Sequence, residues 1–438
     1  MDLVTPEHIL EFEQQMTQRL VECFQLDLRA LVYDGTNFFT YINSRTPAEL
    51  PQRGHNKQKR GDLRQVSLGL LVSADFHTVR AFRIPLFHKV YAGNINDSTE
   101  FRSVTEELSA HYRQLAQSCD HTVRAFRITI VFDKGNNSED GFATLQETPF
   151  HFVGSLVPSQ HADLLAIPRR QFRTLSTAGL EAVEVYRTQK KVFGQPRTIV
   201  VTFNPNLLEG QLQGLKQHLS KARRKLRDLK IQLQRRREGK LKGGKAPTLE
   251  SVQKQIHSIC SAQFVEKILQ AEVREVRKGL VLTFHTDQAA LDRICRVQLG
   301  KTILFTDNAD WPDAQIVLAY RSQYHIEDAF KQMKNPHFLG WSPMHHWTDS
   351  KIEVHAFYCV LALLLTSLLQ RELARKGERL SINHMLEELA TIRETLVVYP
   401  RRQGQRQFPT TTCLTRMSAL QQKLFSVLDL RRYAPASR

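Results

Sequence analysis

The sequence has few cysteines, no long apolar run and fewer acidic than basic residues. Its six cysteines lie far apart and form no Cys-x-x-Cys pair, so neither a disulfide framework nor a zinc site is expected. The longest apolar run, 356–369, is shorter than the roughly 20 residues that a membrane span needs. The N-terminus has no basic segment followed by an apolar one, as a secretory signal would. We therefore expect a soluble protein of a reducing cytoplasm with no membrane partner.

Basic residues outnumber acidic ones by 61 to 44 in 438 residues, which gives a formal net charge of +17. Such a surplus favours a phosphate-rich polymer as partner. Much of it is local, because 216–245 contains 13 Lys or Arg and two acids. Apolar residues recur over 208–233 in steps of four and three, which predicts a helix, and a shorter repeat over 249–259 predicts an antiparallel partner. The pattern leaves open whether the basic face is merely solvated or contacts DNA.

Runs rich in β-branched and aromatic residues dominate the first third of the chain and are interrupted by few helices. The predicted strands are 30–34, 65–73, 79–87, 126–132 and 150–157, with helices at 6–24 and 99–116. Later elements are a β-hairpin that turns at 194–196, strands near 280–285 and 302–306, a long helix over 312–334 and a polar loop over 401–408. This order predicts a mixed α/β sheet rather than a helical bundle.

Three carboxylates lie where catalysis is plausible. Asp34 and Asp133 each end a predicted strand, and Glu327 shares one helix face with Tyr320 and Lys334 because the three are spaced by seven residues. Each has an ordinary alternative. Asp34 with the following glycine is typical of a hairpin turn, Asp133 of a loop, and Glu327 of a surface ion pair.

The helix resembles the Tyr-x2-Arg-x3-Glu-x6-Lys signature of DDE transposases from bacterial insertion sequences, in the group built around insertion sequence four. Other segments are similar to the same family in the same order: 31–38, 53–66, 85–101, 130–138 and 340–365. The resemblance implies a ribonuclease-H-like mixed sheet core with helices. It implies that a β-hairpin plus antiparallel helical hairpin interrupts this core as an insertion.

The resemblance also implies Mg²⁺-dependent cleavage and strand transfer at transposon ends, with Mn²⁺ as a possible substitute. Asp34, Asp133 and Glu327 would then be both the catalytic residues and the metal ligands, because three carboxylates can hold two Mg²⁺ ions. The implied partner is double-stranded DNA, bound by a homodimer in the synaptic complex near the nucleoid of a prokaryote. The implied DNA-binding residues are Tyr320, Gln323, Lys334, Arg321, Lys331, Lys57 and Arg60.

The sequence departs from the family pattern at two places. Gln323 stands where the signature has Arg, which removes a charge-assisted bidentate contact to phosphate. About thirty residues precede Asp34, where relatives carry an end-binding domain, so we expect either a truncated copy or an alternative start. The alternative function is therefore a catalytically impaired remnant that binds DNA nonspecifically. An RNA-binding coiled coil is less favoured, because aromatic stacking motifs are missing.

The expected domains are an N-terminal helix, two parts of the catalytic core separated by the insertion, and a tail. Their bounds are 1–28, 29–160, 161–290, 291–400 and 401–438. Asp307 is a rival second carboxylate, and His345, His346 and His355 are expected to be core or loop residues rather than metal ligands. An octapeptide at 77–84 recurs at 121–128, and we have no physical account of this duplication.

Overall fold

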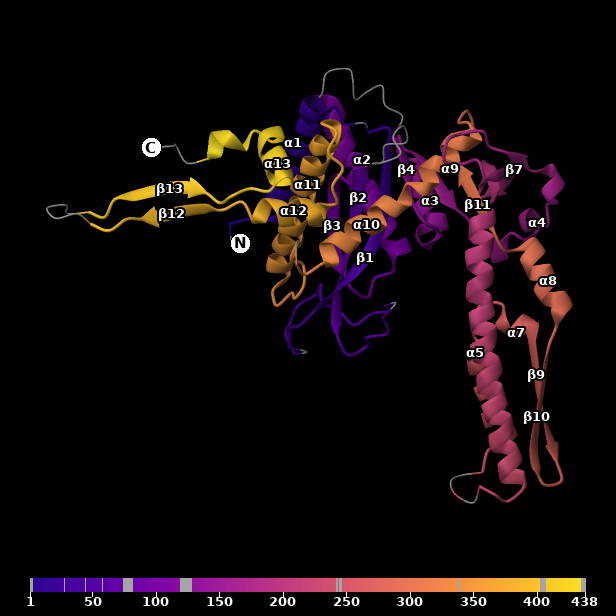
Figure 1. Cartoon of the computed structure of the whole chain (residues 1–438). Helices are drawn as coiled ribbons and strands as arrows, with labels where there is room; N and C mark the ends of the chain where they lie inside the picture. The colour runs from indigo at the N-terminus through magenta and orange to yellow at the C-terminus, as the bar shows by residue number, and fades with distance from the viewer. Residues whose placement is uncertain are drawn as a thin grey trace. The chain divides into compact units, whose positions relative to one another are not determined.

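The chain forms two compact units, one from 1–154 with 318–438 and the other from 155–317. The computed structural model describes 3–26, 28–43, 45–56, 58–73, 82–118, 128–241, 243, 246–337, 339–401 and 407–434. Lys57 and most of both octapeptide copies lie outside these residues. Figure 1 follows the chain by colour, and the first unit combines its indigo and yellow ends.

The first unit is built on a mixed sheet with the strand order β3-β2-β1-β4-β5. These strands are β1 (Ala30–Thr40), β2 (Arg64–Ser73), β3 (Pro85–Ala92), β4 (Thr129–Val131) and β5 (His151–Ser155). The pairs β1–β2 and β2–β3 are antiparallel, whereas β1–β4 and β4–β5 are parallel. This arrangement confirms the predicted mixed α/β class and is consistent with a ribonuclease-H-like fold.

The third strand differs from its prediction. The apolar run suggested 79–87, but β3 begins at Pro85 and continues to Ala92. The length of β3 is set by its pairing with β2, whose residues from Val72 to Val66 are its register partners. Lys89 therefore lies in a strand, although a lysine alone does not favour one. Because a proline cannot donate to the ladder, Pro85 suits the first residue of an edge strand.

Helices pack around this sheet, and two of them form one apolar contact. The helices are α1 (Pro6–Phe24), α2 (Asp97–Ser118), α3 (Glu139–Gln146), α10 (Gln323–Lys334), α11 (Asp349–Arg375), α12 (Ile382–Ala390) and α13 (Ala419–Val427). Ile9 of α1 packs with Val354 and Phe357 of α11. A buried pair joins Glu13 Oε1 of α1 to His88 Nδ1 of β3 at 2.5 Å, so α1 is anchored to the core by both apolar and polar contacts.

The helix α11 is, by length and composition, long and apolar enough to cross a membrane, and 44% of its most apolar window is buried. It packs against α1, α10, α12 and β3 of the same unit. These contacts are those of a core helix.

Farther along the chain, β12 (Glu394–Val398) and β13 (Thr410–Leu414) form an antiparallel hairpin. The sequence predicted the loop between them but not the two strands.

The second unit has an antiparallel sheet in the order β11-β8-β7-β6, made of β11 (Lys301–Thr306), β8 (Gln195–Phe203), β7 (Glu184–Val192) and β6 (Arg173–Thr174). The predicted hairpin is confirmed as β7–β8. Phe193 and Gly194 form its two-residue turn, with φ of 48° and 76°. Two consecutive left-handed residues define the turn type that matches the twist of a hairpin.

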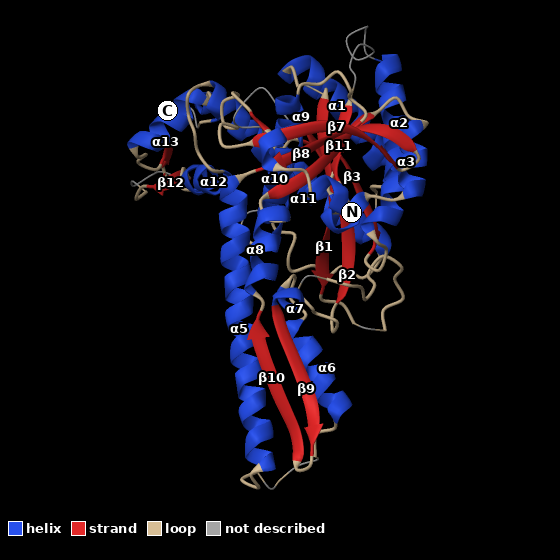
Figure 2. Cartoon of the chain, turned by 90° about the vertical axis from the view of Figure 1, so that its right-hand side faces the viewer, coloured by secondary structure: helices blue, strands red, loops and turns tan. Residues whose placement is uncertain are grey.

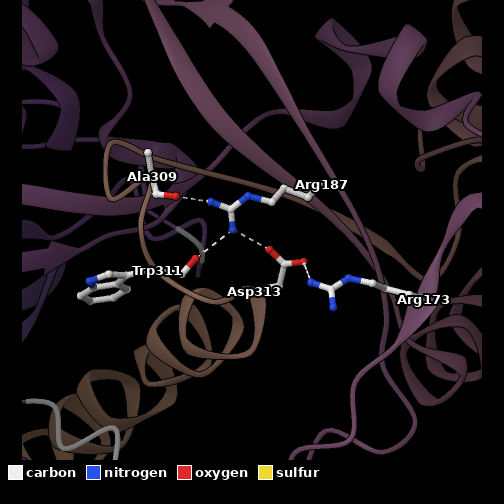
Figure 3. Close-up of polar contacts among 5 residues, drawn as sticks. All are labelled: Arg173, Arg187, Ala309, Trp311 and Asp313. Atoms are coloured by element: carbon white, nitrogen blue, oxygen red, sulfur yellow. Dashed lines mark hydrogen bonds and ion pairs between the residues drawn. The ribbon is translucent and has the colours of Figure 1, made fainter.

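A polar network fixes the start of α9 (Asp313–Arg321) within this unit (Figure 3). The Asp313 carboxylate is fully buried and accepts from both Arg187, at 2.7 Å, and Arg173. Arg187 also donates to the carbonyl oxygens of Trp311 and Ala309, at 2.9 and 2.6 Å. A buried charge is tolerated when it is paired and hydrogen-bonded in this way.

The second unit also contains an arm, defined here as α5 (Pro205–Arg237), α6 (Leu249–Cys260), α7 (Val265–Ile268), β9 (Leu269–Val276), β10 (Gly279–Thr286) and α8 (Gln288–Val297). Both predicted helices are confirmed, and the apolar stripe of α5 is buried. The expected two-helix hairpin is incomplete, because α5 packs against β10 as well as α6 (Figure 2). The stripe shares one core with residues of α6, β9 and β10.

Candidate active site

Asp34 lies in the middle of a long strand. It pairs in register with Leu70 of β2, and Gly35 pairs with Gly69, so the hairpin turn suggested by the Asp-Gly dipeptide is wrong. A ten-pair ladder with β2 outweighs the local turn preference. Asp34 is half-buried, and the N–H of Gly35 donates to its Oδ1 at 2.8 Å.

Asp133 follows the neighbouring parallel strand. Val32 of β1 is the register partner of Val131 of β4, and each aspartate comes two residues later in its own strand direction. Adjacent strands lie about 4.8 Å apart, so the register brings Asp34 and Asp133 to neighbouring positions at the same edge. Asp133 is half-buried, and its carbonyl oxygen accepts from Asn136 N–H at the start of a short 3-10 helix.

Glu327 lies on α10, which packs against β1. The buried side of α10 carries Ile326, Ala329, Phe330 and Met333, as the periodicity predicted. Glu327 and Lys334 are exposed on the other side. Lys334 Nζ donates to Thr36 Oγ1 of β1 at 2.6 Å and lies 5.2 Å from the centre of the Phe38 ring. The helix face that carries Glu327 is thus tied to the strand that carries Asp34.

Tyr320 contacts the second aspartate directly. Its hydroxyl donates to Asp133 Oδ1 at 3.1 Å. Tyr320 lies in the last turn of α9, whereas Glu327 lies in α10, so the single long helix predicted over 312–334 is interrupted. The interruption is at Ser322, whose N–H is shared between the carbonyl oxygens of Leu318 and Ala319.

The other predicted DNA-binding residues fall into different surroundings. Gln323 begins α10, and its Nε2 is buried without a hydrogen-bond partner. Arg321 is half-buried, and burial lowers the pKa of its guanidinium. Lys331 is exposed on α10. Arg60 donates to both carboxylate oxygens of Asp62 at 2.8 and 2.7 Å, and Lys57 lies outside the described residues.

The carboxylates fit a divalent cation in part. Mg²⁺ prefers hard oxygen ligands and uses few carboxylates with water and phosphate, and two aspartates at neighbouring strand positions match that preference. Within the described ranges, however, no three His, Cys, Asp or Glu side chains gather closely enough to hold a metal ion. The donor chemistry of Asp34 and Asp133 suits such an ion, but among the described residues Glu327 is not brought into one cluster with them.

The rival residues have other surroundings. Asp307 follows β11 in the second unit. Burial lowers the pKa of the Arg197 guanidinium, and the charge of Asp307 opposes this effect in part. His355 Nε2 lies 3.1 Å from the carbonyl oxygen of Trp341 and 3.7 Å from Cys359 Sγ. Burial, together with the charge of His355, lowers the pKa of His346. These are the environments of packed histidines.

The sequence did not indicate the residues that support this face. Phe38 stacks on Trp341 with ring centres 3.8 Å apart, and Trp341 is fully buried. Phe38 is also the ring beneath Lys334, and Thr36 is the hydroxyl that Lys334 contacts. All three residues lie in segments around the carboxylates, but their contacts join positions about 300 residues apart, which no local pattern contains.

Comparison with known proteins identifies the family of the chain. The family described as "Transposase DDE domain" matches residues 26–365, which is most of the chain. No curated protein matches the sequence closely enough to count as a relative. The match covers β1, β4 and α10, and with them Asp34, Asp133 and Glu327. The chain belongs to the transposase DDE-domain family.

Proposed function

We propose that this transposase-family chain cleaves and joins DNA at the ends of an insertion sequence of the insertion-sequence-four group. The observation that carries the proposal is the register of β1 with β4, which brings Asp34 and Asp133 to neighbouring positions. The hydrogen bond from Tyr320 to Asp133 supports it, because it links the signature tyrosine to a strand-end carboxylate.

In this proposal Asp34, Asp133 and Glu327 hold divalent cations, Mg²⁺ in the cell. When bound, such ions would supply activation of the attacking oxygen and stabilisation of the leaving oxygen. The carboxylates thereby set where the scissile phosphate lies. Tyr320 donates to Asp133 and so fixes the direction in which that carboxylate points. Hydrolysis and strand transfer use the same residues and differ in the nucleophile.

In this proposal the predicted basic and polar residues bind the DNA backbone. Lys334 is exposed beside Thr36, close to the strand that carries Asp34. Lys331 is exposed one turn earlier on the same helix, and Arg321, Gln323, Lys57 and Arg60 complete the predicted set. The DNA is double-stranded, the acting form is a homodimer that holds two ends together, and the place of action is the prokaryotic cytoplasm, at the nucleoid.

The test is cleavage of a plasmid that carries the inverted repeats flanking the gene, with Mg²⁺ present. Asp34→Asn, Asp133→Asn and Glu327→Gln should each lower the cleavage rate by at least about a thousandfold, because loss of a metal ligand removes several kcal/mol of transition-state stabilisation. Asp307→Asn is the matched control, a strand-end aspartate of the other unit, and should cleave at the wild-type rate. Equal rates in all five proteins would refute the assignment.

A second candidate is the impaired remnant that binds DNA without cutting it. It is favoured by Gln323 in place of Arg and by the lack, in the part of the chain that the structure describes, of a three-carboxylate cluster. This protein would bind the same plasmid and leave it intact in Mg²⁺ and in Mn²⁺. Cleavage by the wild-type chain above that of Asp34→Asn excludes it.

A further inference from the structure

The side of α5 opposite its buried stripe carries exposed cations. The stripe consists of Leu215, Leu219, Ala222, Leu226, Leu229 and Leu233. At about 100° per residue, four basic residues lie within about 60° of the opposite direction, and we call them the outer face: Lys221, Arg224, Arg227 and Arg235. All four are exposed. Among the described residues, none of the four forms an ion pair or a side-chain hydrogen bond.

This pattern differs from that of an ordinary solvated helix. Solvated faces mix both signs, and pairs of opposite charge three or four residues apart support the helix. On α5 these spacings instead join like charges, as between Lys221 and Arg224 or between Arg224 and Arg227. Two acids lie near them on this side of the helix, Asp228 four residues after Arg224 and Glu238 three residues after Arg235. Along 221–238 this side of α5 therefore carries four cations and two acids and is net positive.

The arm extends the same charge to its far end. The turn between β9 and β10 is formed by Arg277 and Lys278, both exposed. Figures 1 and 2 place this turn at the same end of the arm as the C-terminal end of α5. From Lys221 to Arg235 the outer face is about 21 Å long at 1.5 Å per residue, which is more than half a turn of B-DNA.

The chemistry of the face selects its partner. The segment 205–246 contains no Phe, Tyr or Trp, so the outer face offers no platform on which unpaired bases could stack. A straight row of point charges suits the phosphates of a duplex, which carries one negative charge per about 1.7 Å of axis. We propose that the outer face of α5 binds the phosphate backbone of double-stranded DNA, apart from the residues that cut it. This rests on the proposed function, which makes duplex DNA the substrate.

The test measures the affinity of the full chain for a 30-base-pair duplex of random sequence at several salt concentrations. The arm variant carries Lys221→Gln, Arg224→Gln, Arg227→Gln and Arg235→Gln. The control variant removes the same charge from exposed arginines of the first unit, by Arg379→Gln, Arg393→Gln, Arg416→Gln and Arg431→Gln. Glutamine is a good helix former, and equal helix content and melting temperature establish that both variants fold.

Each phosphate contact contributes about 0.9 to the slope of log affinity against log salt. The arm variant should therefore lose about 3–4 units of slope and the control variant less than one. A third variant, Arg224→Lys with Arg227→Lys and Arg235→Lys, should keep the wild-type slope, because phosphate accepts either cation. An unchanged slope in the arm variant, or an equal loss in the control, overturns the proposal.

Two further measurements complete the test. Binding of the arm variant to single-stranded RNA and to phosphatidylserine vesicles is measured in the same way. If the arm variant loses as much binding to either of these anions as to the duplex, duplex DNA is refuted as the partner. Asp34→Asn should keep the full slope, since it does not touch the arm. If catalytic variants cleave like wild type while the arm variant still loses slope, the proposed function fails and the arm assignment stands. If the catalytic variants lose cleavage while the arm variant keeps the wild-type slope, the arm assignment fails and the proposed function stands.

Discussion

Among single residues, Gln323 departs from the family signature, which has Arg at this position. Its Nε2 is buried at the start of α10 and has no hydrogen-bond partner among the described residues, so a substitution breaks no hydrogen bond of this atom there. We predict that Gln323→Arg raises the rate of plasmid cleavage about tenfold or more, because a charge-assisted bond to phosphate is worth about 1.5–3 kcal/mol.

The control for this substitution is Gln332→Arg, which adds the same charge to the same helix at a half-buried position. Cleavage rates of the two variants are compared with wild type under identical salt. A similar gain from Gln332→Arg would mean that added charge alone is responsible. No change from Gln323→Arg would contradict a phosphate-binding role for this position.

Tyr320 provides a second test at this scale. Its hydroxyl bonds to Asp133 at 3.1 Å, and Tyr320→Phe removes the bond while keeping the ring. We expect cleavage to slow by about 10- to 100-fold, as a hydrogen bond to a charged group is worth about 1.5–3 kcal/mol. Tyr324→Phe, an exposed tyrosine one turn later, should cleave normally. Equal rates in both variants would remove Tyr320 from the site.

At the scale of elements, α11 contains a carboxylate in unfavourable surroundings. Burial, helped by the charges of Asp349 and Glu7 and opposed by His88, raises the pKa of Glu353. A raised folded pKa means that the folded state holds its proton more tightly than the unfolded state. Stability is therefore lost as pH rises from the ordinary value of 4.5 through the raised value.

Glu353→Gln should accordingly melt at a higher temperature than wild type at pH 7, by about 2 °C or less. The difference should vanish at pH 4, where both states are protonated. Thermal melts at the two pH values check this. Glu106→Gln, an exposed surface carboxylate, is the control, and a gain of the same size from it at pH 7 would rule out burial as the cause.

The start of α9 depends on one buried carboxylate. Asp313 has a fully buried side chain between Arg173 and Arg187. We predict that Asp313→Ala lowers the free energy of unfolding by about 2–3 kcal/mol, below the 3–5 kcal/mol of a fully buried pair, because both arginines keep some access to water. Asp163→Ala breaks an exposed pair with Lys190 and should cost less than about 1 kcal/mol. Chemical denaturation of both variants decides between these values.

Elements also mark where sequence reasoning succeeds. The heptad of α5 predicted its buried side correctly, because periodicity reports which side of a helix is covered. It did not predict β10 as a partner, because periodicity does not indicate which element packs against the buried side. The Asp-Gly dipeptide at Asp34 suggested a turn, yet the ladder with β2 continues through it. The turn preference of a dipeptide is outweighed when the pairing of two long strands runs through it.

The candidate site shows the same division. Asp133 follows a strand as predicted, whereas Asp34 lies within β1 and not at its end. The family resemblance, more than the local pattern, singled out both aspartates. The contacts of Tyr320 with Asp133 and of Lys334 with Thr36 span 187 and 298 residues. Such contacts are set by how β1, β4 and α10 pack, and a one-dimensional pattern does not encode that packing. The interruption at Ser322 was likewise invisible to helical periodicity.

At the scale of the whole molecule, the chain has two compact units. The arm of the second unit has an apolar core of its own. Proteins with separate cores do not unfold in a single two-state step. We therefore expect calorimetry to resolve at least two transitions, one for each unit.

The two stability variants assign these transitions. Asp313→Ala should lower the transition of the second unit by about 5–10 °C, because 1 kcal/mol shifts a unit of this size by about 2–4 °C. Glu353→Gln should move the other transition, upward and at neutral pH. A single transition that both substitutions shift would mean that the units unfold together. Because the outer face of α5 belongs to the second unit, duplex DNA should raise the transition that Asp313→Ala lowers, and raise it less at high salt.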